Sequence, residues 1–553
     1  MVIYPESFSV KPDTEATTGF RNLFNTSAQA AVNKTLTLLK GNYVFQSKNA
    51  NVREIAISNT MSEKEYEKLG LPEHSHKVAV VIDGVKNMEI DCNDSTFIMD
   101  GKMTHILIKN CENLILKNLT IETVFPDVHK ITILKASPFY VTFEVDATGD
   151  FREENGEYYW YGTDYRTGLK DSVNNGFWFP TAKPDNFNHL KRSQHHPLNG
   201  ASTIRRIGER TFNVRFIVPK DYELGQIFYL YPVCRQEVGI LIDSSSKIKL
   251  KNIKQRYNNA LALIAQNSDN ITVDEVDFSP NPKSEIQLTS LADFMQFSMC
   301  RGKISVKNSN FDSAGDDACN VHGIHFKITE ADKDKLVVEF CHPQTYGINC
   351  IREGDVIAFI NPDTLLEVGR TKVLKAHLKD KYYYHITMAS CEVPIGVGGV
   401  IENVSACPDF EFCNNIINRV VTRGVLVTTR GRVRIENNRF LNTGMSGILI
   451  SDDASHWYES GCVNDVEIRG NAFMNCEDNA ILIKPENKKY KGPVHKNILI
   501  ENNLFVLNET HALNARFSND IIMRGNTYAG TPKNKKWVVA EKVNGFISDA
   551  PEK

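Results

Sequence analysis

The densest group of chemically capable side chains lies in the segment SAGDDACNVHG, residues 313–323, which carries Asp316, Asp317, Asn320 and His322. Asp293 precedes this segment, 23 residues before Asp316 and 24 residues before Asp317. Carboxyl groups that are held side by side repel each other, so the pKa of at least one of them rises. A protonated carboxyl beside an ionised one supplies an acid and a base, which is what hydrolysis of a glycosidic bond requires.

An internal repeat predicts how Asp293 reaches the aspartate pair. An asparagine and an aromatic residue recur after an apolar residue, and a second column of short apolar strands recurs in step with them. The asparagines are Asn415, Asn438, Asn471, Asn503 and Asn526, and the strands are GVLVTT (424–429), GILISD (447–452), AILIKP (480–485) and ALNARF (512–517). The spacings of 23, 33 and 32 residues indicate a coil of about 23 residues with longer loops in some coils. Such a unit cannot bury its apolar face alone and must stack on its neighbours.

We therefore predict an all-β fold, a right-handed parallel β-helix with two inserted small β-barrel or sandwich domains. The repeated asparagines and phenylalanines are interpreted as structural, with the asparagines hydrogen-bonded in a ladder along the stack. One strand column contains the segments 260–266, 294–299 and 318–323. This register predicts that Asp293 lies one coil away from Asp316 and Asp317.

The two adjacent aspartates cannot both point outward from a regular strand, because side chains alternate faces along it. Either Gly315 provides a turn or bulge that exposes both, or one aspartate is catalytic and the other orients it. The pair also has a structural interpretation, as a β-helix turn whose acidic oxygens bind calcium or solvent. His322 would be an unusual addition to a calcium site, and we expect no metal.

The repeat is interrupted twice, and the interruptions predict the domain boundaries. Residues 104–121 align without gaps to residues 238–255, an offset of 134 residues where one coil needs about 23. A second excess follows Gly323. Insertions into loops of a rigid scaffold are tolerated and commonly build binding sites. The predicted units are 1–80 (N-terminal cap and first coil, with a short amphipathic helix and a strand within 26–45), 81–126 (β-helix), 127–236 (first inserted β-domain), 237–323 (β-helix with the catalytic aspartates), 324–405 (second inserted β-domain) and 406–553 (β-helix and C-terminal end).

Composition excludes several classes of function. The formal net charge is −3 and no basic stripe is present, so neither nucleic acid nor a membrane is an expected partner. No segment approaches the roughly 18 uninterrupted apolar residues of a membrane helix. The opening sequence MVIYPESFSVKP shows no export signal. The 12 cysteines form no CxxC pair, which argues against zinc or redox chemistry, and no cofactor is expected.

The segment SDDASHWYESG, residues 451–461, breaks the coil pattern and carries Trp457 and Glu459. An aromatic platform beside a carboxylate suits a sugar, because C–H faces stack on the ring and hydroxyls bond to the acid. The alternative is a loop aromatic that covers the core, and His456 fits either interpretation. Three arginines near the ends of the strand column are interpreted as solvated: Arg423, Arg430 and Arg516.

Three motifs in this order resemble glycoside hydrolase family 110: LAD…CRG (291–302), GDDACNVHG (315–323) and WYESG (457–461). That family comprises bacterial exo-α-galactosidases that act on terminal α-1,3-linked galactose, including blood-group-B-type and linear α-galactosyl glycans. The resemblance spans roughly residues 80–530 and includes two β-domains inserted in a β-helix. Paired aspartates alone are weakly specific, because polygalacturonases share them, but the three motifs together are considerably more specific.

The resemblance implies an inverting, metal-independent mechanism. It implies that Asp293 is the general acid and that Asp316 and Asp317 activate the water molecule. It also implies that Trp457 and Glu459 line the galactose subsite.

The expected partner is an oligosaccharide or glycoconjugate that ends in α-galactose, and Asn320 and His322 are predicted to bind it beside the aspartate pair. The family's glycan substrates favour an exported enzyme. A branching fucose on the substrate, the oligomeric state (a homo-oligomer included) and the division of roles between Asp316 and Asp317 are left open by the sequence.

Two other functions compete with this prediction. A polygalacturonase-like enzyme would pair its aspartates with an NTD tripeptide, a GHG and an RIK, and none of these occurs in suitable order. It would also need cations for a uronate, whereas the 451–461 loop supplies acids. A non-catalytic glycan-binding β-helix, such as an adhesin or tail-spike module, could use Trp457 but would not need acids stacked one coil apart.

Overall fold

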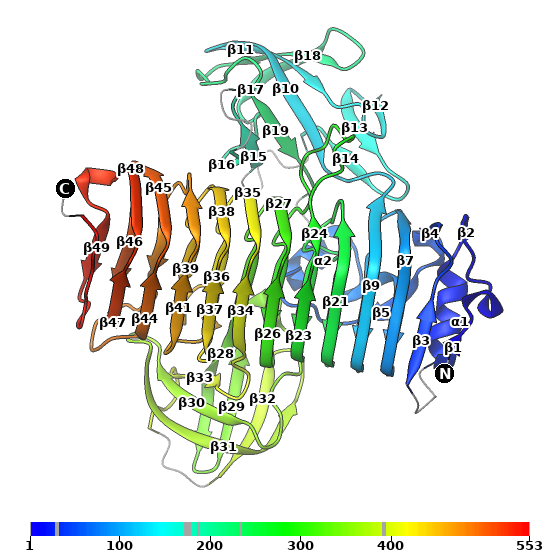
Figure 1. Ribbon diagram of the computed structural model, residues 1–553. Coiled ribbons are helices and arrows are strands. Elements are labelled where there is room, and N and C mark those ends of the chain that lie inside the picture. The colour runs from blue at the N-terminus through cyan, green and yellow to red at the C-terminus, as the bar shows by residue number, and fades with distance from the viewer. Residues whose placement is uncertain are drawn as a thin grey trace.

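The computed structural model describes residues 2–27, 33–170, 179–184, 189–232, 235–389 and 394–551. The chain winds into a right-handed parallel β-helix whose axis runs from the N-terminal to the C-terminal end, with one inserted domain on each side of it (Figure 1). This is the fold class that the repeat predicted.

One wall of the β-helix is a column of short strands that we call the site sheet. Neighbouring strands pair in parallel and in register, so equivalent positions of successive coils lie directly beside each other. After β5 (Asn51–Glu54), which is antiparallel to its neighbour, the strands are β6 (Ser75–Asp83), β8 (Thr104–Lys109), β20 (Ile240–Asp243), β22 (Leu263–Gln266), β25 (Met295–Ser298), β28 (Cys319–Asp332), β36 (Val425–Val427), β39 (Ile448–Ile450), β43 (Asn479–Ile483), β46 (His511–Arg516) and β49 (Val538–Glu541).

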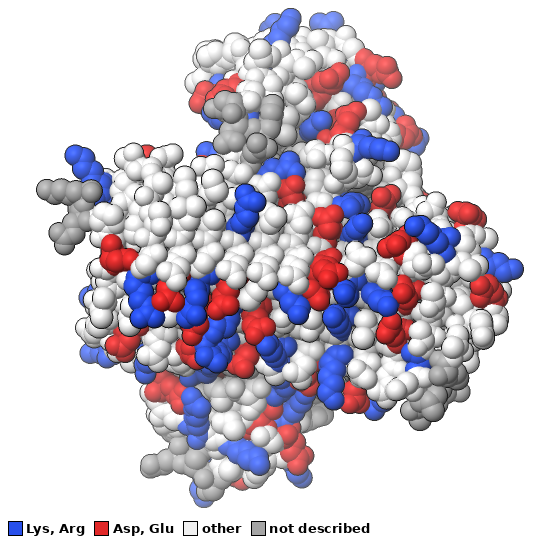
Figure 2. Space-filling model, in the orientation of Figure 1, with Lys and Arg blue, Asp and Glu red and all other residues white. Residues whose placement is uncertain are grey.

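The remaining coil strands form one long sheet, which faces the viewer in Figure 1. Its charged side chains are mixed in sign and lie mainly along its lower half (Figure 2). Arg434 and Glu467, for example, form an ion pair at 3.0 Å. Its strands are β1 (Val2–Ile3), β2 (Thr14–Glu15), β3 (Lys34–Thr37), β4 (Asn42–Gln46), β7 (Lys86–Asp100), β9 (Glu112–Thr123), β21 (Ser246–Gln255), β23 (Asp269–Asp274), β24 (Asp277–Phe278), β26 (Arg301–Lys307), β27 (Asn310–Ala314), β34 (Asp409–Cys413), β35 (Ile416–Val420), β37 (Val433–Glu436), β38 (Arg439–Thr443), β41 (Val466–Arg469), β42 (Ala472–Met474), β44 (His495–Glu501), β45 (Leu504–Asn508), β47 (Ser518–Arg524) and β48 (Thr527–Thr531).

The predicted asparagine ladder is confirmed. The side-chain oxygen of Asn438 accepts the backbone N–H of Asn415 at 2.9 Å, and the same contact recurs along the stack at Asn471, Asn503 and Asn526. The aromatic residues stack beside it, with ring centroids 4.9 Å apart for Phe440 and Phe473, 5.2 Å for Phe473 and Phe505, and 5.5 Å for Phe505 and Tyr528. These residues therefore fix the coil register.

The helix predicted within residues 26–45 falls largely on residues 28–32, which lie outside the described residues. The described helix α1 spans Thr17–Ser27, and the strands β3 and β4 lie in the rest of the predicted segment. The buried Phe20 of α1 packs on Phe45 and Phe97 and so covers the apolar end of the coil stack. The other described α-helix, α2, spans Glu63–Leu69. Neither of these helices is long and apolar enough to cross a membrane.

The first inserted domain, called insert 1, has its own core around Trp160, Phe143 and Phe212. Most of its strands form a seven-stranded antiparallel sheet: β16 (Lys191–Ser193), β15 (Phe179–Ala182), β19 (Ile227–Leu230), β10 (His129–Ser137), β11 (Tyr140–Val145), β18 (Thr211–Phe216) and β17 (Ala201–Arg206). A smaller sheet contains β12 (Asp150–Glu154), β13 (Glu157–Tyr161) and β14 (Arg166–Gly168). Insert 1 lies above the β-helix in Figure 1.

The second inserted domain, called insert 2, is a closed antiparallel barrel on the opposite side of the β-helix (Figure 1). The strand β28 belongs to both units, because it begins in the site sheet and continues into the barrel. The predicted boundary after Gly323 therefore falls inside a strand. Around the barrel, β28 is followed by β29 (Lys335–Phe340), β32 (Tyr383–Met388), β31 (Leu366–Leu378), β30 (Val356–Asn361) and β33 (Val400–Asn403).

Candidate active site

Asp293, Asp317 and Arg423 occupy the same position in three successive coils, two residues before the first residues of β25, β28 and β36. The backbone N–H of Phe294 donates to the carbonyl of Asp317 at 2.9 Å, and that of Ala318 donates to the carbonyl of Arg423 at 3.0 Å. The structure therefore brings Asp293 beside the aspartate pair, as the repeat predicted.

Asp316 and Asp317 both reach the solvent side of the sheet because they lie in the bend between β27 and β28, where strand alternation does not apply. Gly315 allows this bend because it has no side chain where the chain passes close to the backbone of the preceding coil. A Cβ atom at this position would lie 2.5 Å from the carbonyl oxygen of Leu291 in the preceding coil. Both aspartates therefore line the cavity, as the interpretation with a turn at Gly315 predicted, although the Asp317 side chain is only 3% exposed.

The carboxyl groups line a cavity of about 290 Å³, near the lower end of the range for small-molecule sites. Its walls come from the N-terminal segment, insert 1, three coils of the site sheet and the 451–461 loop. The lining residues are Asn59, Arg192, Arg235, Asp293, Asp316, Asp317, Asn320, Arg423, Leu426, Trp457 and Glu459.

Two of the three aspartates are paired with arginines. Arg235 of insert 1 contacts Asp316 at 2.7 Å, and Arg423 contacts the two carboxylate oxygens of Asp317 at 3.0 and 2.8 Å. In the described part of the chain, no ion pair reaches Asp293. Arginines at these positions oppose a second cation, which removes the support for the calcium interpretation.

These contacts separate the protonation states of the carboxyl groups. Burial, together with the negative charges of Asp316 and Asp317, raises the pKa of Asp293 well above its ordinary value, and Arg235 only partly offsets this. Burial also raises the pKa of Asp317, but the Arg423 guanidinium opposes the shift. The arrangement favours the protonated form of Asp293 beside two aspartates paired with arginines, and such a set can act as an acid and a base.

The opposite side of the cavity is formed by Glu459, Asn320 and Trp457. Asn320 donates its amide N–H to Glu459 at 3.2 Å. His322, which was predicted to bind substrate, is 1% exposed and is not among the residues that line the cavity. Its Nε2 lies 3.7 Å from Glu459, so it sits behind that carboxylate.

The conformation of the 451–461 loop is fixed by hydrogen bonds between the Asp453 carboxylate and the loop backbone. Asp453 accepts hydrogen bonds from the backbone N–H groups of Ser455, His456 and Trp457. The Trp457 side chain is 49% exposed, so it is not a cover for the core. His456 is exposed and lies outside the cavity lining.

Sequence reasoning missed the cations of the site. Arg423 and Arg430 are not solvated arginines, because they pair with Asp317 and with buried Glu402. Arg423 could have been found, since it follows Asp317 by 106 residues, the offset that pairs β28 with β36. Arg192 and Arg235 lie in insert 1, where no repeat fixes their place. The argument that a uronate would lack cations here is also wrong, although Arg235 and Arg423 are already engaged by carboxylates.

This site on this fold defines a glycosidase of the parallel β-helix type. Two family models match the chain: right handed beta helix region over residues 382–528, and GLAA-B beta-barrel domain II over residues 335–396. The chain is 35% identical to alpha-1,3-galactosidase A of Bacteroides thetaiotaomicron, over 87% of this chain and 84% of that protein. It is 28% identical to alpha-1,3-galactosidase B of Phocaeicola vulgatus, over 97% and 92%. The chain belongs to this family of α-1,3-galactosidases, glycoside hydrolase family 110.

A similar solved structure is that of an exopolygalacturonase from Thermotoga maritima, with a TM-score of 0.42 and 8% identity over 99% of this chain and 92% of that one. This likeness concerns the fold alone.

Proposed function

We propose that the protein removes terminal α-1,3-linked galactose from glycans of the blood-group-B type or of the linear α-galactosyl type, with inversion at the anomeric carbon. The observation that carries this proposal is that one cavity holds Asp293, whose pKa is raised, beside Asp316 and Asp317, which are paired with Arg235 and Arg423. The names of the relatives support galactose as the sugar and α-1,3 as the linkage.

In the proposed mechanism, Asp293 donates its proton to the glycosidic oxygen as the bond to the anomeric carbon breaks. The aspartate pair accepts a proton from a water molecule as the water oxygen bonds to the anomeric carbon on the opposite face. The products are free β-galactose and the shortened glycan. The Asp316 side chain is 13% exposed and that of Asp317 only 3%, which favours Asp316 as the group that contacts water and Asp317 as the group that orients it.

The shape of the cavity supports action at chain ends. On the N-terminal side of Asp293 the outer face of the site sheet is covered by a buried apolar cluster that includes Ile55, Ile57 and Ala292. On the other side, insert 1 reaches the following coils, where Lys191 pairs with Glu477. A sugar chain that continued in both directions would meet these walls, whereas a terminal residue can enter from solvent.

Release of galactose from an α-1,3-digalactoside tests the proposal, with Asp316→Asn and Asp317→Asn variants as comparisons. We expect hydrolysis by the wild type and a loss of about a hundredfold or more in each variant. NMR of the first product should show β-galactose. Wild-type protein that binds the glycan without cleaving it would favour a binding module, and cleavage of polygalacturonate would favour the polygalacturonase-like alternative.

A further inference from the structure

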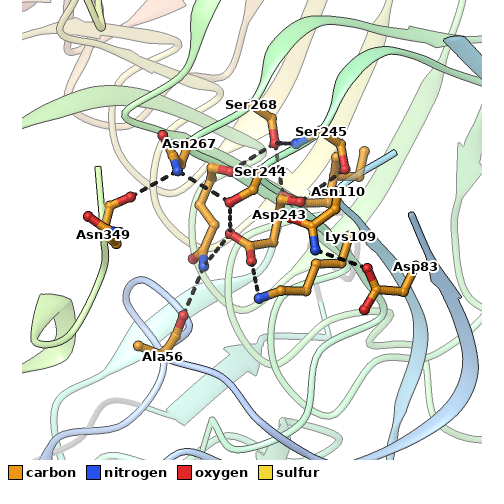
Figure 3. Close-up of polar contacts among 12 residues, drawn as sticks. Ala56, Asp83, Lys109, Asn110, Asp243, Ser244, Ser245, Asn267, Ser268 and Asn349 are labelled. Atoms are coloured by element: carbon orange, nitrogen blue, oxygen red, sulfur yellow. Dashed lines mark hydrogen bonds and ion pairs between the residues drawn. The ribbon is translucent and has the colours of Figure 1, made fainter. Parts of the chain in front are cut away.

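A segment far from the catalytic coils crosses the site sheet and ends at the cavity. After β5 the chain passes over the strands β22 and β25 as Ile55–Met61. The Gln266 side chain fastens it twice, donating to the carbonyl of Ala56 at 2.8 Å and accepting the backbone N–H of Ser58 at 3.0 Å. Figure 3 shows Ala56 at the edge of the polar network around Asp243, whose carboxylate accepts the same Gln266 amide at 3.2 Å.

Asn59 is the residue of this segment that lines the cavity. Its backbone has a φ of +54°, a left-handed conformation that asparagine and glycine tolerate better than most residues. Its backbone N–H donates to the carbonyl of Gln344 in insert 2 at 2.9 Å. Asn59 is therefore fixed from two sides, by the site sheet through Ser58 and by insert 2.

The Asn59 amide is directed at Glu459. Its Nδ2 lies 3.3 Å from Glu459 Oε1, the same oxygen that accepts the amide of Asn320 at 3.2 Å. The other oxygen, Oε2, accepts no hydrogen bond from the described residues. Two neutral donors thus hold one carboxylate oxygen and leave the second available to a ligand.

We propose that Asn59 is a positioning residue for sugar binding: together with Asn320 it orients Glu459 so that Glu459 Oε2 accepts a hydrogen bond from a hydroxyl of the terminal hexose. This inference rests on the proposed galactosidase function, because it assigns a role within the same cavity. It adds the 55–61 segment to the site, although Asn59 and Glu459 are 400 residues apart in the sequence.

The experiment compares Asn59→Gly and Asn59→Asp with the control Asn113→Gly. Asn113 shares the left-handed backbone, with a φ of +54°, and its amide also donates one side-chain hydrogen bond, to Asn87, far from the cavity. Galactose affinity is measured by calorimetry, and kcat and KM are measured on the α-1,3-digalactoside. Because galactose binding needs no hydrolysis, inactive wild-type protein would count against the proposed function without deciding the role of Asn59.

We expect Asn59→Gly to raise both the KM and the galactose Kd about tenfold, with kcat changed less than twofold, since the contact acts in binding. Asn59→Asp should be worse than Asn59→Gly, because it places a second negative charge against Glu459. A purely structural role predicts the reverse order, since aspartate retains the size of asparagine and tolerates its backbone. Unchanged affinity in Asn59→Gly, an equal loss in Asn113→Gly, or better binding by Asn59→Asp than by Asn59→Gly would overturn the proposal.

Discussion

Insert 1 and insert 2 are both inserted into the β-helix, but only insert 1 contributes described residues to the lining of the cavity. Insert 1 contributes Arg192 and Arg235 directly to its lining, and Arg235 contacts the Asp316 carboxylate. Among the described residues of insert 2, none lines the cavity. Its contribution is to brace two residues that do, through contacts of His342 with Trp457 and of Gln344 with Asn59.

We infer from this difference that insert 1 serves the proposed chemistry and that insert 2 serves the recognition of the sugar. A charge stabilises a reacting carboxylate most strongly at hydrogen-bond distance, so the domain that supplies it must enter the site. A binding wall needs rigidity, which a neighbouring domain can provide from behind. Changes in insert 1 should therefore affect kcat, and changes in insert 2 should affect KM.

Of the two inserts, insert 1 is expected to give the larger effect, through Arg235→Met. Without its guanidinium, the Asp316 carboxylate stands partly buried beside two other aspartates, which disfavours its ionised form. We expect kcat on the digalactoside to fall about a hundredfold, with a smaller change in KM. The control Arg205→Met alters an exposed arginine of the same domain and should leave kcat unchanged. Similar kinetics for the two variants would remove the catalytic role of insert 1.

A smaller effect is expected from His342→Ala in insert 2. The His342 and Trp457 rings lie with their centroids 4.6 Å apart, so the substitution frees the exposed indole. An aromatic contact of this kind contributes about 0.5–1.5 kcal/mol, so KM should rise about threefold while kcat stays constant. His385→Ala, on an exposed position of the same barrel, is the matched control. A fall in kcat with constant KM would contradict the division of roles between the inserts.

The smallest expected effect is a change in stability on substitution of Asp293, the aspartate that forms no ion pair with the described residues of either insert. Because the pKa of Asp293 is raised in the folded state, the unfolded chain binds fewer protons than the folded one between the two pKa values. The free energy of unfolding therefore falls as the pH rises through that window. Asp293→Asn should raise the Tm at pH 7 by about 1–3 °C. The gain should vanish below roughly pH 4, where aspartate is protonated in both states. A gain in Tm that does not depend on pH would contradict a raised pKa of Asp293 in the folded protein.

The repeat allowed the coil register and most of the acidic centre to be predicted from the sequence. Parallel coils convert a spacing of 24 residues into contact, so Asp293 and Asp317 could be placed together before any coordinates were known. Trp457 was found because its loop breaks the repeat.

Residues outside the repeat could not be predicted in the same way. Arg235 and Asn59 reach the cavity from an inserted domain and from a crossing segment, and their positions depend on tertiary packing that no spacing encodes. His322 lies two residues after Asn320 on β28, so the alternation of side chains along the strand could not separate the two. In the structure the His322 side chain is buried, with its Nε2 3.7 Å from Glu459.

Hydrolysis of two substrates by Asp293→Asn tests the assignment of the proton donor most directly. α-Galactosyl fluoride needs no proton on its leaving group, whereas the α-1,3-digalactoside does. We predict that Asp293→Asn cleaves the fluoride within about tenfold of the wild-type rate but loses about a hundredfold to ten-thousandfold on the digalactoside. An equal loss on both substrates would contradict the role of Asp293 as the acid.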